Sequence, residues 1–178
     1  TNTKMLLNIV NDSINLSLIE AGFVTTKNEW FDFTEFFSNL HQSLSILINK
    51  NLEFDCLYND HILINSDKTL IHEILNVFIM NANKFTPSGS ITMSYQPEKD
   101  GIRISVTDTG IGIKKQDQQR IFNRFEKLDP FTQGLGLGLT LCHSISKKIH
   151  GRIGVKSELG KGSTFWLRIP CETQLETE

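Results

Sequence analysis

The residues best suited to chemistry lie in three separated segments of this sequence, at residues 81–86, 108–113 and 134–138. Each segment combines polar side chains or glycines over a short stretch. Together they are rich in glycine and poor in catalytic side chains, which suits chemistry driven by positioning and charge neutralisation. The helices and strands that bring these segments together must therefore provide the positioning on which this chemistry depends.

Asp108 ends the alternating stretch ISVTD and is followed at once by Gly110 and Gly112. The alternation predicts a strand. A carboxylate at a strand end can accept a hydrogen bond from an exocyclic amine, while the glycines let the backbone close on a flat ring. This arrangement suits adenine, and an ordinary glycine turn explains the same residues equally well.

Asn81 and Lys84 lie three residues apart near the end of a predicted helix, so they share a face. An amide oxygen is a suitable ligand for Mg²⁺, which takes its other oxygens from water and phosphates. The lysine can neutralise phosphate as a point charge. A solvated polar helix end is the alternative interpretation.

The stretch QGLGLGLTL alternates glycine with leucine and runs directly into a predicted helix. Glycines let backbone N–H groups approach phosphate oxygens, and a helix N-terminus adds partial positive charge. The stretch is not a P-loop, because no Gly-Lys-Ser/Thr follows, and it opens no βαβ unit. A glycine-rich hinge is the alternative.

The elements around these segments predict an α+β domain with a mostly antiparallel sheet and helices on one face. Helices are expected at 33–50, with Thr34 as N-cap, from Asp67 to Phe85, and at 137–151. Two strands are expected around an Asn59-Asp60 turn, and hairpins are expected at 90–108 and 152–169. The long irregular stretch 109–138 is of a kind that is usually functional.

The first residues carry an apolar stripe at helical spacing that ends at Gly22. Its members are Leu6, Leu7, Ile9, Val10, Ile14, Leu16, Leu18 and Ile19. Such a stripe must be buried, either against its own domain or against a partner helix.

The composition is that of an ordinary globular protein, with a formal net charge of −2 that argues against a nucleic-acid partner. The three cysteines are far apart and have no metal-ligand spacing, which indicates a reducing compartment. No apolar run in this sequence approaches the roughly 20 residues that span a bilayer, and the first residues hold too short an apolar stretch for us to expect a signal peptide. We therefore expect a cytoplasmic location, with a membrane anchor elsewhere in a full-length protein left open.

The order and spacing of the three segments resemble the catalytic ATP-binding domain of two-component sensor histidine kinases. NANKFT is similar to that family's N box, DTGIGI to its G1 box, IFNRF to its F box and GLGLGL to its G2 box. The closing stretch GRIGVKSELGKGSTFWLRIP is similar to the family's ending, and LLNIVNDSINLSLIEAG resembles the end of its second dimerisation helix. The stretch EKLDPFTQ most resembles kinases of the hybrid type.

This resemblance implies a two-layer α/β sandwich of the Bergerat type that binds ATP and Mg²⁺. It divides the chain into the end of a dimerisation helix at 1–22, the catalytic domain at 23–172 and a frayed tail at 173–178. It also implies three partners: a domain that carries the phosphoacceptor histidine, a response-regulator receiver domain and, in the full-length protein, a second copy of the chain.

The resemblance also assigns roles to individual residues. Asp108 would bind the adenine amine, Asn81 would hold Mg²⁺ and Lys84 would contact phosphate. The family also has a mobile lid over the nucleotide. The remaining expected nucleotide contacts are Gly110, Gly112 and Ile113 around adenine, Phe122, Phe125 and Lys127 in this lid, Gly134, Leu135, Gly136, Leu137 and Gly138 around the phosphates, and Thr164.

The sequence departs from the family pattern at two points. Val77 occupies the position, one helical turn before Asn81, where the family usually has another asparagine. The phosphoacceptor box is absent, and all five histidines lie in unrelated settings. A catalytically inactive nucleotide-binding module therefore stays open, as does an ATPase of the same superfamily. Such an ATPase usually has a glutamate at the Val77 position.

Overall fold

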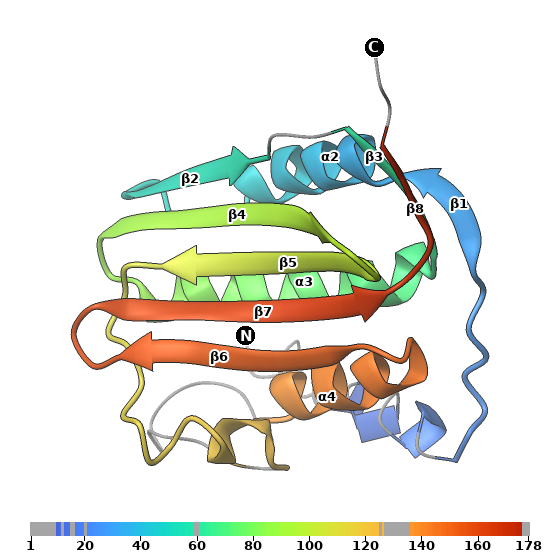
Figure 1. The fold of residues 1–178 in the computed structure, drawn as a ribbon. Helices are drawn as coiled ribbons and strands as arrows, with labels where there is room; N and C mark the ends of the chain where they lie inside the picture. Colours follow the sequence, from blue (N-terminus) through green and yellow to red (C-terminus); the bar gives the residue numbers. More distant parts are fainter. Residues whose placement is uncertain are drawn as a thin grey trace.

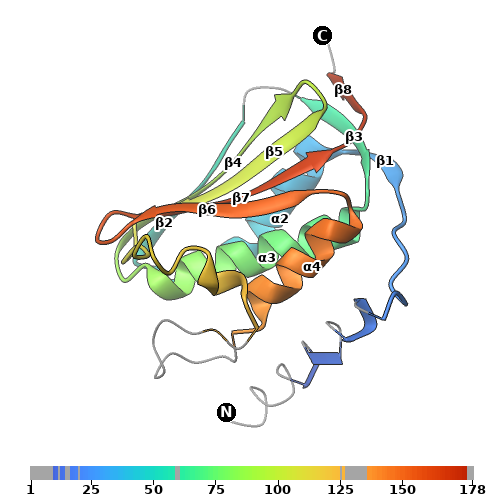
Figure 2. The same cartoon turned by 60° about the horizontal axis from the view of Figure 1, so that its bottom comes forward.

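The computed structural model describes residues 10–11, 13–14, 17–19, 21–58, 61–124, 126 and 136–175. A five-stranded sheet has helices α2, α3 and α4 on one face and a three-stranded sheet at one end (Figures 1 and 2). The larger sheet has the order β2 (Leu52–Leu57), β4 (Gly89–Glu98), β5 (Gly101–Asp108), β7 (Gly162–Pro170) and β6 (Arg152–Glu158). The smaller sheet has the order β1 (Glu29–Asp32), β3 (Ile62–Ser66) and β8 (Thr173–Leu175). The helices are α2 (Phe33–Ser45), α3 (Lys68–Phe85), the 3₁₀ turn η1 (Arg120–Phe122) and α4 (Gly138–Lys148).

The larger sheet sorts its side chains by strict alternation. On β5, Ile102, Ile104 and Val106 face the helices and are at most 1% exposed. Their neighbours Arg103 and Ser105 face the opposite side, because successive side chains of a strand point to opposite faces. Only β2 pairs in parallel, with β4, and the other neighbours are antiparallel. The predicted fold class is therefore confirmed.

Helix α3 is the central support of the helical layer. Asp67 caps it, accepting a hydrogen bond from the Leu70 N–H at 3.0 Å, as the sequence predicts. The same carboxylate accepts the Lys27 N–H at 2.8 Å and so ties the segment before β1 to this helix. Phe78 and Ile79 are fully buried under the sheet. This packing fixes the C-terminal turns, where the candidate site residues lie.

One local prediction before α3 is wrong. Asp32, not Thr34, caps α2, and its carboxylate accepts the Glu35 N–H at 2.8 Å. Thr34 is buried instead, and its hydroxyl lies 2.6 Å from the Tyr95 hydroxyl. The two strands expected around residues 59–60, which lie outside the described residues, are present as β2 and β3 and belong to different sheets.

The C-terminal segment differs from the expectation as well. Residues Thr173–Leu175 were expected to fray but pair antiparallel with β3 as β8, because the exposed edge of β3 offers free backbone groups. Among the described N-terminal residues, Val10, Ile14 and Leu18 are 42–51% exposed, whereas Ile19 packs into the core. Within the described part of the chain, no helix is long and apolar enough to cross a membrane.

Candidate functional site

Two of the three segments meet where α3 ends. The Ile111 N–H donates to the Phe85 carbonyl oxygen at 3.1 Å, which joins the turn after β5 to the last residue of α3. The Thr109 N–H donates to the Ser90 carbonyl at 3.1 Å and fixes the same turn to β4. Residues distant in the sequence are thus held together by backbone hydrogen bonds.

Asp108 lies at the end of β5 on the side that faces the helices. It is only 5% exposed, and the Gly110 N–H donates to its Oδ1 at 2.8 Å. Burial raises the pKa of Asp108, and hydrogen bonds from the backbone N–H groups of Gly110 and Ser163 oppose the rise. A poorly solvated carboxylate at this position favours a ligand that donates a hydrogen bond.

Thr86 contributes a second polar atom beside this carboxylate. The residue is 1% exposed, and its Oγ1 makes no hydrogen bond to any described residue. A Cβ on Gly110 would lie 2.8 Å from Thr86 Oγ1 and 2.9 Å from Asp108 Oδ1. The donor and acceptor atoms of an adenine edge match this pair of oxygens. Nothing in the local sequence pattern indicates that the Thr86 hydroxyl is buried, so Thr86 has no predicted role.

The turn that follows Asp108 is fixed from its far side by the β6–β7 turn. Gly112 has φ +68°, a conformation that favours glycine, and a side chain there would collide with the Glu158 carbonyl. The Ile113 N–H donates to Ser157 Oγ at 2.7 Å, and Ile113 is half-buried against the core. This wall of the site is therefore rigid before any ligand binds.

The third segment reaches α3 one helical turn from Asn81. A Cβ on Gly138, the first residue of α4, would lie 3.2 Å from Val77 Cγ1. The start of α4 has no side-chain cap, since Leu137 at the N-cap makes no such hydrogen bond. Its first N–H groups remain available to an anion.

Asn81 and Lys84 lie on the last turns of the same helix. Asn81 is half-buried, whereas Lys84 is exposed. The Lys84 Nζ lies 5.1 Å from the centroid of the Phe85 ring. One half-buried amide near an uncapped helix start, with a cation one turn further along α3, suits a phosphate chain and its divalent cation. In the described part of the chain, no cluster of three or more His, Cys, Asp and Glu side chains offers an alternative metal site.

The predicted lid anchor Phe122 is tied to α4. Its carbonyl accepts a hydrogen bond from Thr140 Oγ1 at 3.2 Å, and its ring packs near His143 at a centroid distance of 6.5 Å. Gly136 has its backbone against Glu126, and Leu137 is buried. The other expected contacts in this region, Phe125, Lys127, Gly134 and Leu135, lie outside the described residues.

Thr164 does not belong to this site. It pairs with Thr107 across β5 and β7, and the two hydroxyl oxygens lie 3.0 Å apart on the outer face of the sheet. Its neighbour Ser163 pairs with Asp108 on the inner face and donates its N–H to that carboxylate. The assignment was wrong by one residue, which in a strand moves the side chain to the opposite face.

The three segments thus form a site with a buried carboxylate at one end and an uncapped helix start at the other. The model of the family described as histidine kinase-, DNA gyrase B-, and HSP90-like ATPases matches residues 66–173. The chain belongs to this family.

Known relatives specify the type of domain. The chain is 34% identical to the autoinducer 2 sensor kinase/phosphatase LuxQ of Vibrio vulnificus (strain CMCP6), over 94% of the chain and 21% of that protein. It is 35% identical to hybrid signal transduction histidine kinase B of Dictyostelium discoideum, over 93% of the chain and 9% of that protein. The crystal structure of full-length ShkA in complex with AMPPNP matches 96% of the chain and 37% of that structure, with a TM-score of 0.86 and 28% identity. The chain is therefore a catalytic ATP-binding domain of the histidine-kinase type, and it spans only a small part of these relatives.

Proposed function

We propose that this domain transfers the γ-phosphoryl group of Mg·ATP to a histidine that the present sequence does not contain. The observation that carries the proposal is the position of Gly138 beside Val77, one turn from Asn81. It brings an uncapped helix start to within one turn of the Asn81 amide, and Lys84 follows one turn further along α3, toward the end of the site that contains Asp108. Transfer of a phosphoryl group depends mainly on such positioning and charge neutralisation.

The residues of the site have separate roles in this transfer. Asp108 accepts a hydrogen bond from the adenine amine, and Thr86 Oγ1 faces the same edge of the base. Asn81 is the protein ligand for Mg²⁺, and the backbone at the start of α4 holds phosphate oxygens together with Lys84. Bound Mg²⁺ would supply charge neutralisation at the phosphates. Lys127 and the glycine at 134 are further phosphate contacts by resemblance.

Val77 argues against ATP hydrolysis as the main reaction. Its side chain is apolar and packs on Gly138, so this position can neither orient nor deprotonate a water molecule. An ATPase of this superfamily usually has a glutamate there. The absence of a base is compatible with transfer to a histidine, because an imidazole is itself the nucleophile.

The partners follow from the same proposal. A phosphoacceptor domain must present its histidine to the site, and a receiver domain would take the phosphoryl group onward, as in the hybrid kinases that the chain resembles. The exposed side chains of Val10, Ile14 and Leu18 support a homodimer formed through the N-terminal helix. The free thiols of Cys56, Cys142 and Cys171 support a reducing, cytoplasmic setting.

The test is phosphoryl transfer in trans. The chain is incubated with labelled ATP, alone and with a helical hairpin that carries an acceptor histidine. We expect acid-labile label on the hairpin and none on the chain, because no histidine of the described site stands where a γ-phosphate would lie. Acid-labile label on the chain itself would contradict these roles.

A second function, a nucleotide-binding module without transferase activity, is favoured by one observation. Val77 replaces the polar residue expected beside Asn81. If ATP binds but no supplied hairpin becomes labelled, this regulatory role replaces the kinase proposal.

A further inference from the structure

Three arginines stand side by side on the outer face of the five-stranded sheet. Arg103 on β5 is directly opposite Arg168 on β7, and Arg168 is directly opposite Arg152 on β6. Lys156 follows Arg152 on the same face two positions along β6. Like charges placed directly opposite each other destabilise a sheet, so this row has to be explained.

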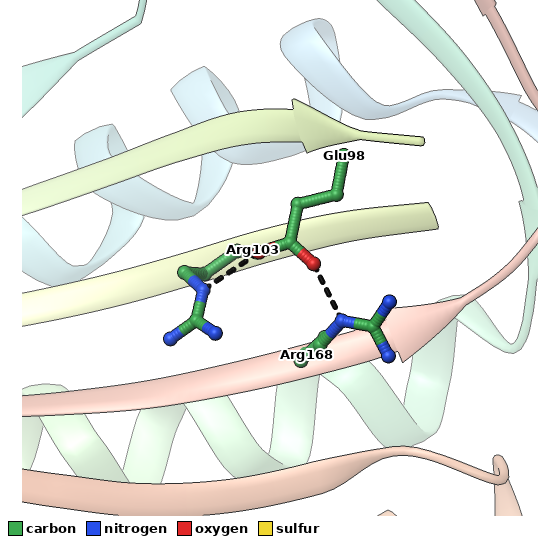
Figure 3. A network of polar contacts seen from close by, with 3 residues as sticks. All are labelled: Glu98, Arg103 and Arg168. Atoms are coloured by element: carbon green, nitrogen blue, oxygen red, sulfur yellow. Dashed lines mark hydrogen bonds and ion pairs between the residues drawn. The ribbon is translucent and has the colours of Figure 1, made fainter. Parts of the chain in front are cut away.

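One carboxylate holds two of these arginines. Glu98 Oε1 accepts a hydrogen bond from Arg103 Nε at 2.8 Å, and Glu98 Oε2 accepts one from Arg168 Nε at 2.5 Å. Both oxygens of Glu98 are therefore engaged by Nε groups. Figure 3 shows that the terminal nitrogens of both guanidinium groups point away from Glu98. Each arginine keeps its two terminal donor groups for another acceptor.

An aromatic ring packs against one arginine of the row. Arg103 Cζ lies 4.7 Å from the centroid of the Trp166 ring, within the range of a cation–π contact. Trp166 faces Gly154 across β6 and β7, and its ring lies over this residue, where any side chain would collide with it. The side chains of Arg103 and Arg168 are nevertheless 34% and 36% exposed. The cluster is thus both ordered and accessible.

Among the described residues, Glu98 is the only carboxylate that forms an ion pair with this row of cations. Arg152 is exposed and makes no ion pair with any described residue, and Glu158 at the far end of β6 is paired with Lys161 at 2.7 Å. Helices α2, α3 and α4 all cover the other face of the sheet (Figure 2). Arg103 and Arg168 therefore share the carboxylate of Glu98, whereas Arg152 and Lys156 form no ion pair with any described residue on this uncovered face.

We propose that this face, defined by Arg103, Arg152, Lys156, Trp166 and Arg168, docks a protein surface that presents two or more carboxylates. Guanidinium groups bind carboxylates through paired N–H donors, and tryptophan and arginine dominate the binding energy of protein interfaces. The pairing of Glu98 with Arg103 and Arg168 shows that these arginines donate hydrogen bonds to a carboxylate partner. Nucleic acid fits less well, because Glu53 and Asp55 lie on the same face at the β2 edge and the chain is acidic overall.

Trp166 reports directly on this face. The chain has two tryptophans, and Trp30 is 44% exposed on β1, so Trp30→Phe leaves Trp166 as the single fluorophore. The probe is an octaglutamate peptide, titrated into the Trp30→Phe protein. We expect a saturable change in emission that disappears as salt is raised, because exposed charge pairs are screened. Arg152→Gln should weaken the affinity by about threefold, as expected for the loss of one exposed charge pair.

Lys147→Gln is the matched control, since it removes the same charge from α4 on the other side of the sheet. It should leave the peptide affinity unchanged, and neither variant should alter the affinity for ADP. No emission change, or equal weakening by Arg152→Gln and Lys147→Gln, would overturn the proposal. A single-stranded oligonucleotide that binds the same arginines more tightly than octaglutamate would also overturn it, in favour of a nucleic-acid partner. ADP binding is measured separately, so failure here leaves the nucleotide site untouched.

Discussion

Val77 on α3 packs against Gly138 at the first residue of α4, where an added Cβ would lie 3.2 Å from Val77 Cγ1. This apolar contact joins the helix that carries Asn81 to the helix start proposed to hold phosphate. It also fills the position at which the histidine-kinase pattern has a polar side chain. The contact therefore holds Asn81 close to the start of α4. The apolar Val77 side chain, however, supplies no hydrogen-bonding group to the site.

Replacing Val77 by asparagine should raise the rate of phosphoryl transfer. The amide would place a polar group one turn from Asn81, and we expect transfer to a supplied hairpin to rise by about tenfold, or ~1.4 kcal/mol in the barrier. Val77→Ala is the control, because it shortens the side chain without adding a polar group. Equal rates for the two variants would show that the apolar residue does not limit transfer.

Asn81 should act through the metal. We expect Asn81→Ala to abolish the enhancement of ATP binding by Mg²⁺ and to leave metal-free binding nearly intact, because an amide ligand contributes only when the ion is bound. Calorimetry with and without Mg²⁺ measures both quantities. The control is Asn83→Ala: Asn83 Oδ1 accepts the Asn49 N–H at 2.9 Å, so this change should lower stability without altering the Mg²⁺ effect. A parallel loss of metal-free binding in Asn81→Ala would make Asn81 structural.

Thr86 and Thr34 form a matched pair of buried threonines. Thr86 Oγ1 has no hydrogen-bond partner among the described residues, whereas Thr34 Oγ1 accepts the Ile62 N–H at 3.0 Å. Thr86→Val should raise the free energy of unfolding by about 1–2 kcal/mol, and Thr34→Val should lower it by about 1–3 kcal/mol. Urea denaturation of the nucleotide-free proteins measures both. Changes of the same sign would contradict this difference in hydrogen bonding.

The sequence was sufficient for features that depend on local pattern. Alternation predicts β5 and therefore the position of Asp108 at its end, and Asp67 with the apolar run behind it predicts α3. The glycines also predict the positions of the turn after Asp108 and of the start of α4.

Features that depend on distant contacts could not be predicted. The alternation of β7 does not say which face is inner, so Thr164 was placed in the site instead of Ser163. The patterns of β2 and β3 are compatible with a hairpin, and only the competing edges of β4 and β1 place them in separate sheets. Thr86 is buried because Gly110, distant in sequence, packs against it.

Nucleotide binding should weaken in mild acid. Burial raises the pKa of Asp108, and the protonated carboxyl no longer accepts strongly from the adenine amine, so ADP affinity should fall as pH drops through the raised value. Stability should move the other way. The native state binds this proton more readily than the unfolded state, so the Asp108 contribution to stability is lost as pH rises from about 4 through the native pKa.

The comparison that isolates this effect is Asp108→Asn, which cannot titrate. The wild-type protein should lose ADP affinity on acidification relative to this variant, as calorimetry at a series of pH values would show. Identical pH profiles for the two proteins would mean that another group carries the dependence.

ADP affinity of the Asp108→Asn protein tests the nucleotide site most directly. The buried carboxylate, which accepts the Gly110 N–H at 2.8 Å, is the group that we assign to adenine. Loss of a charge-assisted hydrogen bond costs roughly 1.5–3 kcal/mol, so calorimetry should show ADP and ATP affinities that are both lower by about tenfold or more. Thr164→Val, on the outer face of the sheet, should bind both nucleotides like the wild type. An Asp108→Asn protein that stays folded and binds ADP with unchanged affinity would contradict the assignment of this site to a nucleotide.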